Sequence, residues 1–220
     1  MRAALVGCTL LLVALATACS KPPPLTEPGN ARFAAPAPDS FDVELITTRG
    51  PLTVRVHRDW APHGADRFHA LVQGRYFDGL AFFRVVRGFV AQFGLHGDTA
   101  VTHAWDSRRI PDDSTKTSNV RGTLSFASAG PDSRSTQLFF NLGDNGRLDR
   151  LGGNGFMPIG QVTAGMPVLT ELYSEYSGSG GQELPGPSQD SIQAQGDAYL
   201  RRNFPLLDRI ERARVVRGWR

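Results

Sequence analysis

Apolar and polar side chains alternate along residues 41–56, which is the pattern of half-buried β-strands. The alternation is interrupted at the turn-forming pair Gly50-Pro51, so the segment predicts a β-hairpin. Further short apolar runs, separated mainly by Asp-Gly, Gly-Pro and Asn-Gly pairs that favour turns, predict strands at 81–86, 89–93, 122–127, 137–142 and 156–162. With a last strand expected at 210–216, so many short strands indicate a closed barrel or a sandwich.

Three other segments have the spacing of an amphipathic helix. The first spans residues 62–72, begins at Pro62 and has Gly74 just past its end, and these residue types are common at helix boundaries. The second helix is expected at 166–173. The third is expected at 190–203, with Pro205 beyond its end.

The first 18 residues have the features of a secretory signal peptide. Arg2 is followed by an apolar stretch too short to span a bilayer, and small residues precede Cys19. The run Leu-Ala-Thr-Ala-Cys that ends there is similar to a bacterial lipobox, in which the cysteine is acylated and becomes the mature N-terminus. We therefore expect a lipid on Cys19, and ordinary cleavage near Ala18 is the alternative. Since Cys8 lies in the segment to be removed, Cys19 keeps no cysteine partner, and acylation accounts for it.

Residues 19–40 are expected to be a tether. They contain six prolines among small and polar residues, a composition that buries too little apolar surface to fold and favours an extended chain. This segment would hold a globular domain of residues 41–220 away from a membrane. We expect the protein to be exported and lipid-anchored to the bacterial cell envelope, on the periplasmic or outer-membrane side. Ser20 after the cysteine is compatible with an outer-membrane destination.

The distribution of charge and of histidines argues against nucleic-acid binding and against metal binding. The net charge of +3 is modest and the basic residues are scattered. Aromatic and basic residues are not interleaved as in proteins that bind single-stranded nucleic acid, so no nucleic-acid partner is expected. The five histidines have neither the spacing nor the carboxylate companions of a metal site, so no metal is expected.

Three blocks of sequence carry a more specific signal. Residues 82–94 read F-F-R-V-V-R-G-F-V-A-Q-F-G; residues 124–131 read L-S-F-A-S-A-G-P and are followed by S-T-Q-L-F-F at 135–140; L-D at 148–149 is followed by F-M-P-I-G-Q-V at 156–162. In content and in order these blocks resemble those of the cyclophilins, a family of peptidyl-prolyl cis-trans isomerases. The likeness runs from residue 41 to about residue 173.

The resemblance implies a mainly β fold, a closed eight-stranded antiparallel barrel capped by helices, to which this chain adds a C-terminal helix. It implies a monomeric isomerase that needs no cofactor and acts on Xaa-Pro segments of unfolded or exported proteins. Without the resemblance, the apolar residues of the three blocks would be assigned to the core and the polar ones to the surface.

Carried over position by position, the resemblance also implies a site. Arg84 would be the catalytic residue, because its guanidinium stays charged and can donate a hydrogen bond to the prolyl nitrogen. Gln92 and Gln137 would hydrogen-bond around the substrate. An apolar proline pocket, with its edge, would be formed by Phe89, Val90, Phe139, Leu148 and Phe156. The residue before proline would be bound by the backbone of Ala127, Ser128 and Ala129.

The chain departs from the cyclophilin pattern at three positions. Arg147 stands where many members have a tryptophan, Phe156 where a histidine is usual, and Ser128 where asparagine is commoner. Because the tryptophan helps to bind cyclosporin, weak cyclosporin binding is expected. Arg84 and both glutamines are kept, so we expect the isomerase chemistry to be kept too. The altered positions leave two alternatives open: a peptide-binding or chaperone module with little turnover, and a lipoprotein that docks a partner away from Arg84.

Overall fold

The computed structural model describes residues 24–151, 155–177 and 186–219. The expected signal peptide, Cys19 and the first residues of the expected tether lie outside the described residues. No helix in the described ranges combines the length and apolar character needed to cross a membrane.

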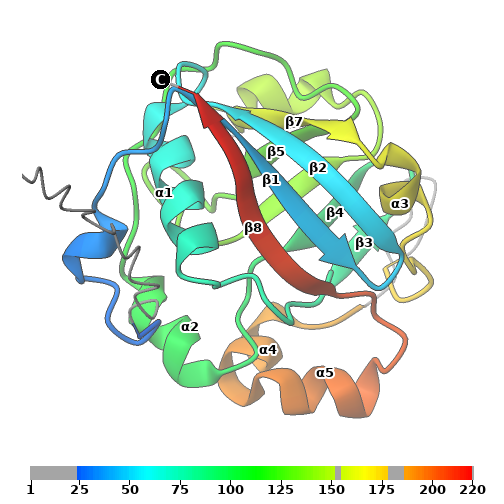
Figure 1. Cartoon of the computed structure of the whole chain (residues 1–220). Helices are drawn as coiled ribbons and strands as arrows, with labels where there is room; N and C mark the ends of the chain where they lie inside the picture. The colour runs from blue at the N-terminus through cyan, green and yellow to red at the C-terminus, as the bar shows by residue number, and fades with distance from the viewer. Residues whose placement is uncertain (1–23, 152–154, 178–185, 220) are drawn as a thin grey trace, which may run out of the picture.

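Eight antiparallel strands form one strongly curled sheet (Figure 1). The strand order is β3-β4-β6-β5-β7-β2-β1-β8. The first two strands are the predicted hairpin, in which Phe41 pairs with Val56 and Leu45 with Leu52. Their apolar side chains are buried, as the alternation predicted. The strands are β1 (Ser40–Thr47), β2 (Gly50–His57), β3 (Arg84–Val86), β4 (Val90–Phe93), β5 (Thr123–Phe126), β6 (Leu138–Asn141), β7 (Pro158–Ala164) and β8 (Ile210–Trp219).

The barrel closure expected from the resemblance is not confirmed, because β3 and β8 are the two edges of the sheet and do not pair. The segments that precede these strands do meet, since Phe82 donates its backbone N–H to the carbonyl of Asp208 and an isolated bridge joins the two segments. Beyond that point the chains separate. The N–H of Val85 in β3 donates to the hydroxyl of Ser177 at 3.2 Å instead of to a strand. The sheet is therefore an open half-barrel.

Helix α1 (Pro62–Gln73) covers one side of the curled sheet and closes the main core. It has Pro62 in its first turn and ends at Gly74, which agrees with the predicted boundaries. Ala65, Phe68 and Leu71 are buried on its inner face. Phe68 packs on the ring of Phe77, with the centroids 5.4 Å apart. Burial of such side chains against the sheet is the main stabilisation of a helix of this length.

Two short helices differ from expectation. Helix α2 (Thr99–Asp106) was not predicted, although Asp98 caps its N-terminus by accepting the backbone N–H of Ala100 at 2.8 Å. Helix α3 (Met166–Thr170) is shorter than the predicted 166–173. The structure also has two 3₁₀ turns in its described ranges, η1 (Ala31–Phe33) and η2 (Gly146–Arg150).

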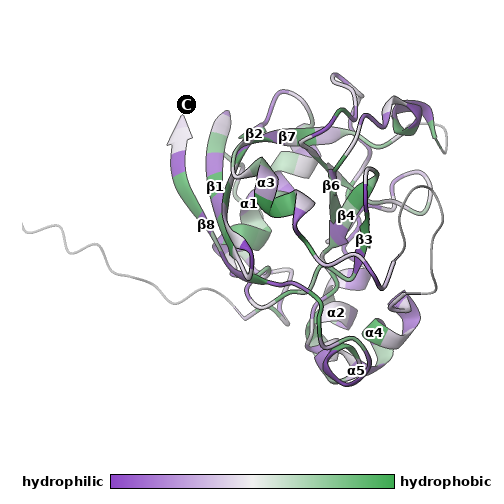
Figure 2. Ribbon diagram, turned by 90° about the vertical axis from the view of Figure 1, so that its right-hand side faces the viewer, coloured by the Kyte–Doolittle hydropathy of each residue, from purple (hydrophilic) through white to green (hydrophobic). Residues whose placement is uncertain are grey.

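The expected C-terminal helix is present but broken into α4 (Gln189–Gln195) and α5 (Asp197–Asn203). Gly196 separates them with φ +62°, outside the helical region, and a Cβ at this position would lie 2.1 Å from the carbonyl oxygen of Gly97. The break thus allows the backbone of the helix pair to approach the loop after β4. Figures 1 and 2 show α2, α4 and α5 together at one end of the molecule.

The described part of the expected tether is not a detached, extended chain. Phe33 of η1 packs edge-on against Trp105 of α2, with the ring centroids 5.2 Å apart. The indole N–H of Trp105 donates to the carbonyl of Leu25 at 2.8 Å. Both Leu25 and Phe33 pack against the main core. A few apolar residues among the prolines are thus enough to dock residues 24–40 on the domain.

Candidate active site

Three residues of the expected site lie in one row across three strands. Arg84 on β3 pairs in register with Gln92 on β4, and Gln92 pairs with Phe139 on β6. Because residues in register on neighbouring strands share a face, these side chains lie on the same face of the sheet. The next row, which includes Ala91 and Phe140, points into the main core.

A chain of hydrogen bonds links the two glutamines to the arginine. Arg84 donates from Nη1 to Oε1 of Gln92 at 3.2 Å, and Gln92 donates from Nε2 to Oε1 of Gln137 at 2.9 Å. The backbone carbonyl of Gln137 in turn accepts the N–H of Ala127 at 2.9 Å. The expected catalytic arginine, the two glutamines and the expected backbone-binding segment are therefore brought together.

The residues of the expected proline pocket form a small apolar cluster that is separate from the main core. Val90, Phe139 and Leu148 are its buried members. Phe89, Ala127 and Phe156 are partly buried and pack against them, which leaves apolar surface beside Arg84 that is open to a ligand. All the side chains assigned to the pocket thus lie in one place, and their roles in binding stay predictions.

The rim of this cluster differs from the pattern of the resemblance in a specific way. Phe156 packs edge-on against Phe139, with the centroids 5.5 Å apart. The guanidinium carbons of Arg84 and Arg147 lie 5.6 and 4.8 Å from the centroid of the Phe89 ring. The aromatic ring of Phe89 is therefore held by two cations at the edge of the site.

A buried network of asparagines, which the sequence analysis missed, supports the pocket. Asn145 donates to the carbonyl of Phe89 at 2.8 Å, and Asn119 donates to the carbonyl of Phe156 at 2.6 Å. Asn141 links the two asparagines, through bonds of 2.8 and 3.1 Å. Single asparagines in a sequence are typical of turns, so no local pattern indicated that three of them share one buried site.

Asp149 anchors this network at the end of η2. Its carboxylate accepts the hydroxyl of Ser118 and both the backbone and side-chain N–H groups of Asn119, the last two at 2.8 Å. Burial by itself raises the pKa of Asp149, but these hydrogen bonds outweigh it and hold the pKa below its ordinary value. An ionised Asp149 therefore fixes η2, which carries Leu148.

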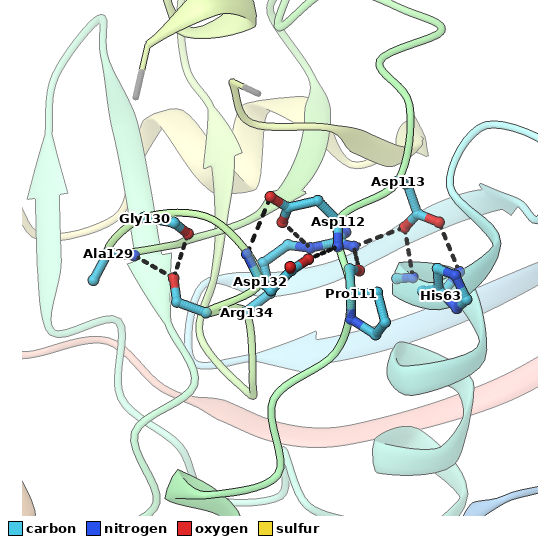
Figure 3. Close-up of polar contacts among 10 residues, drawn as sticks. His63, Pro111, Asp112, Asp113, Ala129, Gly130, Asp132 and Arg134 are labelled. Carbon is cyan, nitrogen blue, oxygen red and sulfur yellow. Dashed lines mark hydrogen bonds and ion pairs between the residues drawn. The ribbon is translucent and has the colours of Figure 1, made fainter. Parts of the chain in front are cut away.

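The loop that carries the backbone-binding segment is held by its own hydrogen bonds (Figure 3). The hydroxyl of Ser133 accepts the N–H of Ala129 at 2.8 Å and donates to the carbonyl of Gly130 at 2.7 Å. Asp112 and Asp132 each accept the other's backbone N–H, at 3.1 and 2.7 Å. The segment at Ala129 is therefore presented by a fixed loop, although its residues are partly exposed.

Arg134 joins that loop to helix α1 from inside the protein (Figure 3). Its side chain is 1 % exposed and forms an ion pair of 3.0 Å with Asp113, and it also lies 3.4 Å from Asp112. Asp113 accepts the backbone N–H groups of His63 and Gly64 at the start of α1, at 2.9 and 3.0 Å. One buried ion pair thus connects the core helix with the loop that carries the expected backbone-binding segment.

The arrangement is suited to rotation chemistry. The guanidinium of Arg84 stands beside partly exposed apolar surface, and Gln92 and Gln137 link it to the backbone of Ala127. Among the described residues there is no group of three or more histidine, cysteine, aspartate or glutamate side chains placed to hold a metal ion.

Comparison with known proteins agrees with this geometry. The family model for the cyclophilin type peptidyl-prolyl cis-trans isomerases matches residues 42–192. A peptidyl-prolyl cis-trans isomerase of Acinetobacter baylyi is 28 % identical over 163 residues, covering 73 % of this chain and 87 % of the relative. The isomerase CYP18-1 of Arabidopsis thaliana is 31 % identical over 148 residues, covering 66 % of this chain and 89 % of the relative.

The fold is shared with solved structures. A cyclophilin type isomerase of Cryptosporidium parvum superposes with a TM-score of 0.57 at 20 % identity, covering 81 % of this chain and 99 % of that structure. A second structure of that protein, determined in the presence of the dipeptide Ala-Pro, gives the same TM-score at 19 % identity. With the family match spanning all three sequence blocks, the chain belongs to the cyclophilin-type family and is a peptidyl-prolyl cis-trans isomerase.

Proposed function

We propose that this isomerase assists the folding of exported proteins, and that Arg84 promotes rotation about the Xaa-Pro bond. The observation that carries the mechanism is the placement of Arg84: it is hydrogen-bonded to Gln92 and lies over the ring of Phe89, at the edge of the apolar cluster. A prolyl ring seated on that cluster would bring its nitrogen towards the guanidinium.

The chemistry requires no nucleophile and no metal. Rotation is slow because the nitrogen lone pair is delocalised into the carbonyl, which gives a barrier of roughly 18–20 kcal/mol. A hydrogen bond from Arg84 to the prolyl nitrogen would localise the lone pair and favour the twisted amide. Such a charge-assisted bond is worth about 1.5–3 kcal/mol, whereas an acceleration of ~10⁴–10⁵-fold needs roughly 5–7 kcal/mol. The apolar pocket must therefore supply the rest by fixing the ring and excluding water.

The test uses the chain from Ser20 onward, which retains every described residue. We expect it to accelerate cis-trans exchange of a short Xaa-Pro peptide, and Arg84→Ala to lower kcat/KM by about 10- to 100-fold, the value of one charge-assisted hydrogen bond. Arg87→Ala is the matched control. Arg87 lies in the same hairpin and pairs with Glu175 at the surface, so its loss should leave the rate unchanged. Undiminished exchange in Arg84→Ala would refute the mechanism.

A peptide-binding module with little turnover is the second candidate. It is favoured by the altered rim, where Phe156 packs on Phe139 and Arg147 lies over Phe89. This alternative predicts that proline peptides bind without acceleration and that binding survives Arg84→Ala. Measuring affinity and exchange rate on the same peptides therefore separates the two functions.

We also propose that the exported chain is anchored by a lipid on Cys19. Support comes from the lipobox-like run that ends at Cys19, and the docking of Leu25 on Trp105 of α2 limits how far the domain can stand from that residue. Pro24 follows Cys19 by five positions, so the domain would stand within about 18 Å of the lipid. Mass spectrometry of the membrane fraction should find an acylated N-terminal Cys19. The Cys19→Ala chain should leave that fraction, and its retention there would contradict the anchor.

A further inference from the structure

Helix α4 stands beside the active site and is firmly packed there. Ile192 of α4 and Leu200 of α5 are buried in a cluster of their own with Phe83 and Leu95. Phe83 is the neighbour of Arg84 in the sequence. Asp197, at the start of α5, donates its N–H to the carbonyl of Gly97 at 2.9 Å. The helix is thus fixed against the strands that carry the site.

A cavity of about 330 Å³ lies between α4 and the backbone-binding loop. Gln92, Gln137 and the segment 127–129 line it on the side of the sheet. Gln189 and Gln193 line it on the side of the helix. They are one helical turn apart, so both reach the same face of α4. The cavity therefore continues the active site and ends at the helix.

Gln189 also borders a second cavity, of about 500 Å³, which is lined by Arg84 and by Ser177. The first turn of α4 thus borders both cavities, of which one reaches Gln92 and the other reaches Arg84. In the described part of the chain, no hydrogen bond engages the side-chain amide of Gln189 or of Gln193. Both amides can therefore donate to and accept from a ligand.

The family match ends at residue 192, inside α4. Gln193 and α5 consequently lie beyond the part of the chain that the family model covers, whereas Gln189 lies within it.

We propose that Gln189 and Gln193 are specificity-determining residues of the isomerase, which hydrogen-bond a polar, uncharged side chain one or two positions before the proline. The position rests on the proposed function and on the role that the resemblance implies for residues 127–129, whose backbone would bind the residue before proline. The preference for a polar, uncharged side chain follows from the residues that line the cavity of about 330 Å³. Side-chain amides dominate, Ser133 and Ser135 add hydroxyls, and the opposite charges of Asp106 and Arg109 give no preference for either sign.

The test compares proline peptides that carry glutamine or leucine at the first or the second position before proline. We expect kcat/KM of the wild-type chain to favour glutamine at one of these positions by about five- to tenfold, the effect of one neutral hydrogen bond. In Gln189→Ala and Gln193→Ala the ratio should fall towards one. The matched control is Gln195→Ala on the same helix. Gln195 accepts a hydrogen bond from Arg202 at the surface, and the control should keep the wild-type ratio.

Equal rates on all four peptides with the wild-type chain would overturn the proposal, as would a preference that both variants keep. Binding of the same peptides to the Arg84→Ala chain, followed by nuclear magnetic resonance titration, reports the preference without turnover. A glutamine preference in binding together with full exchange activity in Arg84→Ala would contradict the mechanism and support the role of α4. Loss of exchange in Arg84→Ala without any glutamine preference would support the mechanism and contradict the role of α4.

Discussion

The guanidinium carbon of Arg147 lies 4.8 Å from the centre of the Phe89 ring, in the geometry of a cation–π contact. Arg147 is exposed on η2. Phe89 is partly buried and lies in the turn between β3 and β4. The rim of the expected proline pocket therefore carries a charged, flexible side chain at the position where many cyclophilins have an indole. A long arginine covers the ring of Phe89 but offers a ligand less rigid apolar surface.

This contact leads to a prediction about cyclosporin. The wild-type chain should bind it weakly, and Arg147→Trp should tighten binding by about fivefold, because a buried aromatic contact is worth ~1 kcal/mol beyond its area. Isothermal titration of the purified proteins measures both affinities. Arg150→Trp on the same turn is the control and should remain at the wild-type value. Tight binding by the wild type would contradict the prediction.

The second prediction concerns the buried ion pair of Arg134 and Asp113, beneath the loop that carries the expected backbone-binding segment. Arg134→Ala leaves the carboxylate of Asp113 buried without its cation, and we expect the free energy of unfolding to fall by about 3–5 kcal/mol. Urea denaturation measures the loss. The partly exposed pair of Arg58 and Asp66 is the comparison, and Arg58→Ala should cost about 1 kcal/mol or less. Similar losses in the two variants would show that burial does not set the strength of the pair.

Asp149 gives a prediction with a definite pH dependence. Hydrogen bonds from Ser118 and Asn119 hold its pKa below the ordinary value in the folded chain, against the opposing effect of burial. A carboxylate with a lowered folded pKa contributes stability above its unfolded pKa, about 3.9, and the contribution disappears as the pH falls through the folded pKa. At pH 7, Asp149→Asn should therefore lower the free energy of unfolding by about 1–2 kcal/mol.

Urea denaturation at pH 7 and near pH 3 measures this difference, which should shrink at the lower pH. The neighbouring exposed Asp144 accepts one backbone N–H, from Arg121 at 3.0 Å, so Asp144→Asn should cost less at pH 7. A loss in Asp149→Asn that is the same at both pH values would mean that its charge is not the source of the stability.

The break between α4 and α5 supplies a further prediction. Gly196→Ala would force a Cβ to 2.1 Å from the carbonyl oxygen of Gly97 at a backbone φ of +62°. We expect a loss of about 2–4 kcal/mol from strain and overlap together. Gly79→Ala separates the two causes, because Gly79 also has a positive φ, +82°, but its Cβ would meet nothing within 4 Å. That control should lose about 1 kcal/mol, and equal losses would show that the contact with Gly97 is unimportant.

Local pattern was sufficient for the elements that bury one face. Phe41, Val43 and Leu45 alternate with polar residues, and all three are buried in β1 as expected. Pro62 and Gly74 mark the ends of α1, because the steric rules that place them act within one turn of the chain. The three ordered blocks assigned residues to the site, and the structure places Arg84, Gln92 and the apolar cluster together, while their roles stay predictions.

The features that the sequence left undecided or wrong all depend on residues far apart in the chain. The sheet stays open at β3, where the hydroxyl of Ser177 accepts the hydrogen bond of the Val85 N–H. The docking of Leu25 on Trp105 joins segments that are 80 positions apart. The break at Gly196 follows from its approach to Gly97.

The sequence by itself therefore determined most of the strands and helix α1, and it assigned residues to a site whose members the structure brings together, since periodicity and motif order are local properties. Only the tertiary structure decided the open edge of the sheet, the buried asparagine network under the pocket and the wall that α4 adds to it. Each of these rests on hydrogen bonds or packing between distant segments, whose partners no local pattern specifies.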